Sequence, residues 1–484
     1  MSAARNILLI LAFTLLAMAV MGYHPGFEDD GVYLTAIKSE LNPSLYSHDA
    51  EFFRLQLQAS VFDKSVAALI RLTGIPVAWA ELLLQVASIL LIVAACWSIA
   101  RKLFAEERAR WAGVAMVAAM LTLPVAGSAL NMADQHLHPR NVATGFILVA
   151  VSRILAGKRW HAVPLLAMAF LFHPLMAALG ISFCLFLTLA MLDRQSAASG
   201  PVAAMAPLGW VFTAPTPEWR RALGTRTYYF LFKWTWYEWL GAVGPLILFW
   251  QLWRFASKRR ETTLARFSLA VVGYGVFQLI IAIVINATPA LVRLIPLQPM
   301  RFLHLIYFFL TLVSGCLIGK YVVNDNVWRW AMFLVVINVG MFASQRALVG
   351  GTEHLEMPGS HSVNPWLQAF EWIRRNTPTT AYFALDPYYL ASPGEDYHSF
   401  RALAERSQLA DGVKDPAVVT QVPVLGPDWD RQISAQSGWT SFRLADFERL
   451  KAEFGVDWVL VRYPEPAGLK CRWHNKNLSV CEIP

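Results

Sequence analysis

The sequence predicts a mainly α-helical protein whose helical bundle crosses a membrane many times and which ends in a soluble α/β domain. Composition is the first reason: 56% of the 484 residues are hydrophobic and 15% are charged, where soluble domains have about 25% charged residues. The second is the division of the chain, because the long apolar runs lie within residues 1–345, whereas residues 346–484 have a soluble composition. The third is that lysine and arginine form short clusters between the apolar runs, as the positive-inside rule requires of cytoplasmic loops.

The first apolar run, residues 6–22, follows Arg5 and predicts a helix that begins on the inside. A cleaved secretory signal is the alternative, but residues 21–25 are a poor small-residue cleavage site, so we expect a retained span. Seven later runs each have about the length of one span: 77–100, 111–130, 141–156, 240–256, 264–285, 302–319 and 328–344.

The region between residues 161 and 239 is harder to divide into spans. The apolar run 161–193 is too long for one straight span, and His173-Pro174 should kink or break it, while a weaker apolar patch covers 202–214. The basic clusters that mark the cytoplasmic side lie at 101–110, 157–159, 258–260 and 320. The cluster at 157–159 lies inside, and the span 240–256 returns to the inside at 258–260, so the region between them must contain an odd number of crossings, one or three. This predicts nine or eleven spans with the N-terminus inside and the C-terminus outside.

Two outside regions are long enough to hold structure, the polar first loop at 23–60 and the tail at 346–484. Patterns in the tail predict helices at 366–375 and 442–454 and strands at 381–385, 457–461 and 478–480. A hairpin over 471–481 would bring Cys471 and Cys481 together, and the outside compartment permits a disulfide there. The remaining cysteines lie in apolar runs and are interpreted as packing residues.

The net charge of +8 raises the question of nucleic-acid binding. The basic residues are distributed among the predicted cytoplasmic loops rather than gathered on one face. We therefore interpret the charge as topology, and expect a membrane but no nucleic acid as partner.

Three consecutive acidic residues, Glu28, Asp29 and Asp30, open the first outside loop and are the leading catalytic candidates. The alternative is that they cap a helix after Pro25-Gly26 and complement its dipole, although capping needs fewer than three carboxylates. Consecutive helical residues point in different directions, so one or two of them can face a shared site, and we favour Asp29 or Asp30. A partly desolvated carboxylate at a membrane interface should have a raised pKa and act as a base on a hydroxyl.

A second group of candidates, Asp134, His136, His138 and Arg140, occupies the next outside loop. In an extended strand the first three would share one side, so a metal site is one interpretation, but no further ligand is nearby in sequence. The interpretation we favour is an interfacial polar cluster for an anionic headgroup. Arg140 at the start of a helix suits a phosphate, because the guanidinium and the helix N-terminus act together.

Further polar candidates lie in or beside the apolar runs and in the tail. His173 is an intramembrane ionisable residue, which either serves a site or hydrogen-bonds the carbonyls that the following proline frees. Arg293 and Arg301 lie in the third outside loop, where they are either snorkelling anchors or, against the positive-inside bias, the binding residues of an anion. Arg406 and Lys414 contribute only if the tail domain packs back over the membrane.

This layout resembles that of the GT-C glycosyltransferases, polytopic enzymes that transfer a sugar from a polyprenyl-phosphate carrier at the outer face of a membrane. The shared features are an acidic motif that opens a long first outside loop, a basic residue in a later outside loop, and an extracytoplasmic C-terminal domain. Short segments also resemble bacterial GT-C-like membrane proteins of unassigned function: 42–46, 136–140, 173–174, 298–301, 372–378, 400–401, 406 and 414–416.

The resemblance implies a GT-C-like helical domain in the bacterial inner membrane, with a polyprenyl-phosphate lipid as donor and a glycan, lipid or protein as acceptor. It makes Asp29 or Asp30 the catalytic carboxylate, and Arg140 or Arg301 a contact to the lipid phosphate. The Glu-Asp-Asp motif departs from the lone Asp or the Asp-Glu pair of the family, so the choice of carboxylate stays open. No motif of the metal-dependent oligosaccharyltransferases is present, so we expect no metal and no cofactor.

Two other functions use the same charged residues. A transporter or flippase for a lipid-linked or anionic solute would need them as a pathway without a base, although the hydropathy has no internal repeat. A non-catalytic GT-C-like assembly protein would keep the fold without the activity. The enzyme interpretation requires that the acidic triplet, Arg140 and Arg301 converge on one outward cavity.

Overall fold

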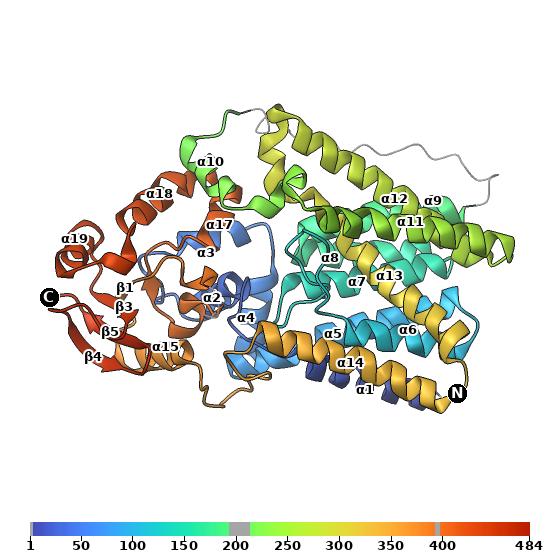
Figure 1. Ribbon diagram of the computed structural model, residues 1–484, viewed down its shortest axis with the longest axis horizontal. Coiled ribbons are helices and arrows are strands. Elements are labelled where there is room, and N and C mark those ends of the chain that lie inside the picture. Colours follow the sequence, from blue (N-terminus) through green and yellow to red (C-terminus); the bar gives the residue numbers. More distant parts are fainter. Residues whose placement is uncertain (1–2, 193–212, 393–396) are drawn as a thin grey trace.

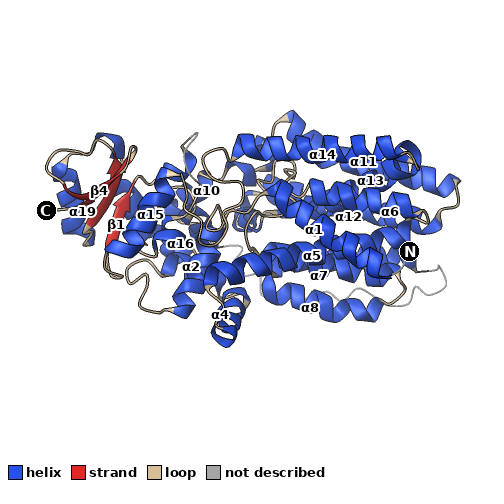
Figure 2. Cartoon of the chain, turned by 90° about the horizontal axis from the view of Figure 1, so that it is seen from below, coloured by secondary structure: helices blue, strands red, loops and turns tan. Residues whose placement is uncertain are grey.

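The long helices lie side by side at one end of an elongated molecule, and a small sheet lies at the other end (Figure 1). The computed structural model describes residues 3–192, 213–392 and 397–484. The N-terminus lies at the far end of the bundle and the C-terminus beside the sheet, and both views separate the helical part from the mixed part (Figures 1 and 2).

The bundle has a buried centre and an apolar surface, since one of its helices, residues 303–318, is mostly buried and another, residues 327–348, is exposed along most of its length. Its described helices are α1 (Ala3–Met21), α5 (Val77–Leu103), α6 (Glu107–Ala119), α7 (Pro139–Leu155), α8 (Ala162–Phe172), α9 (Pro174–Met191), α11 (Trp236–Lys258), α12 (Thr262–Ala287), α13 (Leu303–Ile318) and α14 (Val327–Leu348). On α1 and α14, Leu15 is 65% and Val336 63% exposed. Leucine and valine exposed along whole helices suit a surface that faces lipid rather than water.

Six stretches among the described residues have the length and hydropathy of a membrane span: Ala3–Met21, Val77–Leu103, Pro174–Met191, Thr262–Ala287, Pro299–Val323 and Val327–Leu348. They indicate a multi-pass membrane protein. The predicted total of nine or eleven spans and the N-in, C-out orientation stay predictions. The weak patch at 202–214 falls almost wholly on residues 193–212, which lie outside the described residues.

Two predicted spans differ from single straight helices. The run 111–130 is helical only as far as Ala119, because Pro124 cannot continue a helix, and the residues after it form a tight turn in which Val125 N–H donates to the Leu130 carbonyl at 2.8 Å. The break predicted at His173-Pro174 is confirmed, since α8 ends just before His173 and α9 begins just after it.

Residues 23–60, the predicted first outside region, are largely helical. Helices α2 (Asp30–Leu41) and α3 (Glu51–Leu57) lie within it, and α4 (Phe62–Thr73) follows. In both views α2 lies between the bundle and the sheet (Figures 1 and 2). Buried aromatic residues such as Tyr46 and Phe53 form a small core within this region, and the Tyr46 hydroxyl donates to the Arg401 carbonyl of the tail at 3.0 Å.

The tail contains a five-stranded sheet in the order β2-β1-β3-β5-β4. Its strands are β1 (Tyr382–Leu385), β2 (Ser407–Gln408), β3 (Trp458–Arg462), β4 (Lys470–His474) and β5 (Leu478–Glu482). The helices beside it are α10 (Pro217–Gly224), α15 (Pro365–Asn376), α16 (Phe400–Ala404), α17 (Asp415–Gln421), α18 (Gly426–Ala435) and α19 (Leu444–Phe454). The helices and strands predicted for the tail are confirmed, and the predicted hairpin forms the Cys471–Cys481 disulfide.

The tail domain packs back onto the first outside region. Arg401, which is buried, donates to Asp49 at 2.5 Å and to both carboxylate oxygens of Asp415 at 2.7 and 2.9 Å. The backbones also approach closely, because a Cβ at Gly31 would lie 2.6 Å from the Cβ of Ser399. This packing brings the basic residues of the tail to the acidic motif.

Candidate functional site

A cavity of about 500 Å³ lies where the first outside region, the bundle and the tail domain meet. Its walls come from α2, from the first residues of α7 and α9, from the 3-10 helix η5 (Pro289–Leu297) and from α17. It is lined by these residues that the sequence singled out: Asp29, His138, Arg140, His173, Arg293, Arg301 and Lys414. The other candidates do not line it: Glu28, Asp30, Asp134, His136 and Arg406.

The three acidic residues at the start of α2 point to three different places. Glu28 pairs with the ammonium of Lys414. Asp29 faces the cavity, and its Oδ1 accepts a hydrogen bond from Lys414 Nζ at 3.2 Å; although it is the N-cap residue, its side chain makes no capping bond. Asp30 is buried, and its Oδ2 accepts from the backbone N–H of Gly26 at 2.6 Å. Asp29 is therefore the member of the triplet that a ligand in the cavity meets.

The pKa values of the two aspartates shift in opposite directions. Burial disfavours the charged form of Asp29, but Lys414 and Arg140 outweigh it and hold the pKa of Asp29 well below its usual range. Burial and the neighbouring Glu81 raise the pKa of Asp30 well above its ordinary value, which favours the protonated carboxyl. The raised pKa expected for an interfacial base is thus wrong for Asp29, because Lys414 lowers it. The sequence could not indicate this effect, since Lys414 lies 385 residues further along the chain and reaches Asp29 only in the fold.

Two helices begin at the cavity with the same dipeptide, His138-Pro139 in α7 and His173-Pro174 in α9. Proline suits the first helical position, where a backbone N–H would have no partner. Each histidine accepts a backbone N–H at Nδ1, at 2.9 Å in α7 and 3.4 Å in α9, so the neutral ring carries its proton on Nε2. The cavity thus receives the positive ends of two helices, which is an arrangement that binds anions.

Arg140 is held in place by Asp134. Its Nε donates to Oδ2 at 3.1 Å and its terminal nitrogen to Oδ1, and both side chains are buried. Although burial opposes it, the paired Arg140 holds the pKa of Asp134 well below its usual range. Asp134 is therefore the partner of the guanidinium rather than a metal ligand beside His136 and His138. His136 is buried away from the cavity.

Three further arginines line the cavity, and none forms an ion pair with a carboxylate in the part of the chain that the structure describes. Arg301 donates to Gln298 Oε1 at 2.9 Å, while Arg226 and Arg293 donate to backbone carbonyls. Arg226 belongs to no motif, so the sequence alone did not identify it; its bond to the loop of Lys414 places it here. Arg226 is buried and Arg293 and Arg301 are partly buried. Cations at a cavity without a carboxylate partner are the complement of an anionic ligand.

Arg406 does not reach the cavity. It is buried and donates to the backbone carbonyls of Arg374 and Thr377 at 2.8 and 2.6 Å, which fastens the end of α15 to the segment after α16. Arg406 is therefore not among the residues that a ligand in this cavity would meet.

No family model and no curated protein matches the chain. The fold is similar to that of the archaeal oligosaccharyltransferase AglB from Archaeoglobus fulgidus, solved in complex with an inhibitory peptide and a dolichol-phosphate, with a TM-score of 0.37 and 11% identity over 95% of this chain and 70% of that one. A likeness of this degree carries no argument about function, which rests on the cavity.

Proposed function

We propose that the chain is a membrane glycosyltransferase of the GT-C type, which transfers a sugar from a polyprenyl-phosphate donor to an acceptor at the outer membrane face. One observation carries the proposal: a single cavity gathers the carboxylate of Asp29 with basic side chains from four separate segments. Such a site suits a reaction in which a base activates a hydroxyl while an anionic group leaves.

The basic residues suit the phosphate of the donor. Arg140 stands at the start of α7, so its guanidinium and the helix N-terminus face the same anion. Arg301 and Arg226 have no carboxylate to satisfy them among the described residues and present planar donor groups, which match phosphate oxygens. Together they would stabilise the charge that develops on the leaving polyprenyl phosphate.

One wall of the cavity is apolar and suits the prenyl chain. Phe172, Leu175 and Leu297 line it, at the junction of α8 and α9 and at the end of η5. On α8, Phe170 and Leu171 are 52% and 45% exposed, which is typical of side chains that face lipid. A prenyl chain along this wall would pass from the phosphate site into the membrane.

The chemical step we propose is an inverting displacement. The acceptor hydroxyl attacks the anomeric carbon from the face opposite the phosphate, and its proton passes to Asp29. The bond between the anomeric carbon and the phosphate oxygen breaks, and its electrons leave with the polyprenyl phosphate. Lys414 donates to Asp29 and lines the same cavity as the arginines, so a phosphate bound there would draw the ammonium away from Asp29 and make that carboxylate a stronger base.

A transfer assay tests the proposal directly. Purified protein is incubated with radiolabelled sugars on polyprenyl phosphate and with a membrane extract as the source of acceptors, and the label that leaves the donor is measured. We expect release that depends on the protein. A flippase would move the intact donor between leaflets, and an assembly protein would neither move nor cleave it. If the donor stays intact under conditions where the protein binds it, the glycosyltransferase proposal is refuted.

Replacing Lys414 by methionine should move the acid limb of the pH–rate profile to higher pH. Activity requires ionised Asp29, so it is present above the pKa of Asp29 and is lost as the pH falls through it. Lys414 is the main group that lowers this pKa, and without it burial raises the pKa. Glu28→Gln is the matched control, because it leaves Lys414 bound to Asp29 and should not move the limb upward. An unmoved limb in Lys414→Met would mean that Asp29 is not the base.

A further inference from the structure

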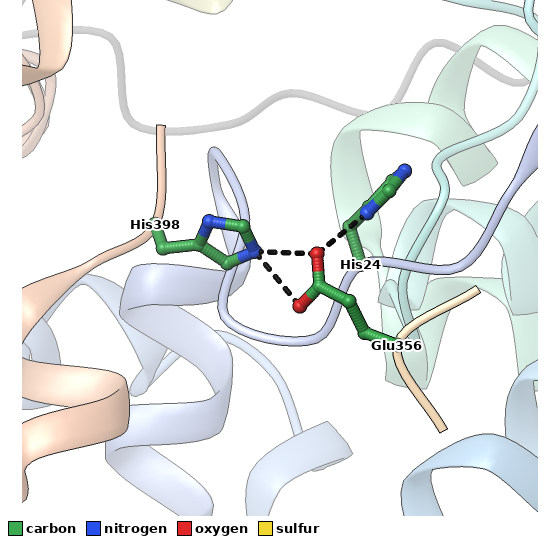
Figure 3. Close-up of side chains that lie close together, drawn as sticks. All are labelled: His24, Glu356 and His398. Atoms are coloured by element: carbon green, nitrogen blue, oxygen red, sulfur yellow. Dashed lines mark hydrogen bonds and ion pairs between the residues drawn. The ribbon is translucent and has the colours of Figure 1, made fainter. Parts of the chain in front are cut away.

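A second cluster of ionisable side chains lies outside the cavity, at the joint between the bundle and the tail domain (Figure 3). His24 follows α1, Glu356 stands between α14 and α15, and His398 lies two residues before α16. Figure 3 shows the carboxylate between the two imidazoles. Glu356 Oε1 is 2.7 Å from His24 Nδ1, Glu356 Oε2 is 3.0 Å from His398 Nε2, and the three ligand atoms all lie within 4.8 Å of one another.

The residue types, their spacing and their burial favour a metal ion. Both histidines are 0% exposed and Glu356 is 10% exposed. Two imidazoles and one carboxylate are the donor set of several zinc sites, with bonds of about 2.0–2.2 Å, so ligand atoms on one ion lie roughly 3–4 Å apart. Within the described chain the carboxylate meets the two histidines and the hydroxyl of Thr352, with no lysine or arginine paired to it. A divalent cation would neutralise this buried negative charge.

The backbone already holds the three ligand segments together. Glu356 N–H donates to the Tyr23 carbonyl at 2.9 Å, and Ser399 N–H donates to the Gly26 carbonyl at 2.8 Å. A pocket of about 170 Å³ opens beside the cluster, and Tyr23 and Glu356 line it, whereas His24 and His398 do not. Water and an ion would therefore approach from the side of Glu356. A site that is held in this way loses little freedom when it binds an ion.

We propose that His24, Glu356 and His398 bind one divalent transition-metal ion, for which Zn²⁺ is the best match. The ion would join the end of α1, the connection after α14 and the tail domain, and water from the pocket would complete its coordination. The segment that begins at His24 leads to Asp29, so the ion also restrains the segment that carries the cavity carboxylate. The proposal does not depend on the glycosyltransferase assignment.

The test is metal content and metal-dependent stability of the whole protein, purified without a histidine tag. We expect about one ion per chain by mass spectrometry of the elements. After chelation, added Zn²⁺ should restore one bound ion and raise the unfolding temperature by several degrees. Glu356→Gln and His398→Ala should each weaken Zn²⁺ binding by at least about 100-fold, because even outer-shell partners of zinc are worth 10- to 100-fold.

His361→Ala is the matched control, since His361 is an exposed histidine in the same connection as Glu356. This variant should bind Zn²⁺ like the wild-type protein. The proposal would be overturned if the wild type, Glu356→Gln and His398→Ala bound Zn²⁺ equally well. It would also be overturned if added Zn²⁺ left the unfolding temperature of the chelated wild-type protein unchanged. Zn²⁺ binding by the wild-type protein is measured directly, so the proposal can be refuted even if a variant fails to fold.

Discussion

Replacing Asp29 by asparagine should lower kcat for sugar transfer by roughly 10²- to 10⁴-fold, which is the usual share of general acid–base catalysis. Asparagine has nearly the same shape, and its amide oxygen can keep the hydrogen bond that Asp29 Oδ1 accepts from Lys414 Nζ at 3.2 Å. It cannot take the proton of the acceptor hydroxyl. The fold and donor binding should therefore persist while turnover is lost, as measured by steady-state transfer of labelled sugar and by donor affinity.

Asp30→Asn is the control for this prediction, one residue away in the same motif. Asp30 is buried against Gly26, and its raised pKa favours a neutral carboxyl, so the substitution exchanges one neutral group for another. The amide oxygen can still accept the Gly26 N–H. We expect activity close to that of the wild type. Loss of activity in Asp30→Asn together with full activity in Asp29→Asn would place the base on the buried side of α2.

Local features of this chain were predictable because neighbouring residues determine them. The break at His173-Pro174, the helices and strands of the tail and the Cys471–Cys481 disulfide all follow from a proline, a period or a spacing that can be read within a dozen residues. The loops between apolar runs were predicted to hold the polar candidates, and Asp29, Arg140 and Arg301 from three such loops line one cavity. The end of α6 at Ala119 was not predicted, because an apolar run indicates burial but not the length of a helix.

The pairings across the chain were not predictable, and the errors are of one kind. The pKa of Asp29 was expected to rise with desolvation, and it falls because a lysine from the tail domain lies beside it. His24, Glu356 and His398 lack any common motif, since three separate segments bring them together. Arg226 follows a weak apolar patch, and a hydrogen bond to a backbone carbonyl of the tail positions its side chain. Each depends on how the tail domain packs onto the rest of the chain.

Replacing Arg301 by glutamine should lower kcat by roughly 10²- to 10³-fold, the cost of removing one donor that stabilises a developing anion. The donor carries its phosphate as a diester with one negative charge, and the leaving polyprenyl phosphate carries more. A guanidinium at this site is therefore bound more strongly in the transition state than in the ground state, so kcat should fall further than donor affinity. Arg301 meets Gln298 and no carboxylate among the described residues, so its charge is available to the phosphate.

The control removes a positive charge elsewhere. Arg159 is exposed just beyond the C-terminal end of α7, whereas the cavity lies at its N-terminal end, and its guanidinium lies against Trp160. Arg159→Gln should leave kcat unchanged. Arg301→Lys should recover part of the lost rate, because an ammonium keeps the charge but not the two-pronged geometry of a guanidinium. If Arg301→Gln weakens donor binding and kcat stays within a few-fold of the wild type, the arginine only positions the donor, and the charge that develops on leaving must be stabilised by Arg140 and the N-terminus of α7 instead.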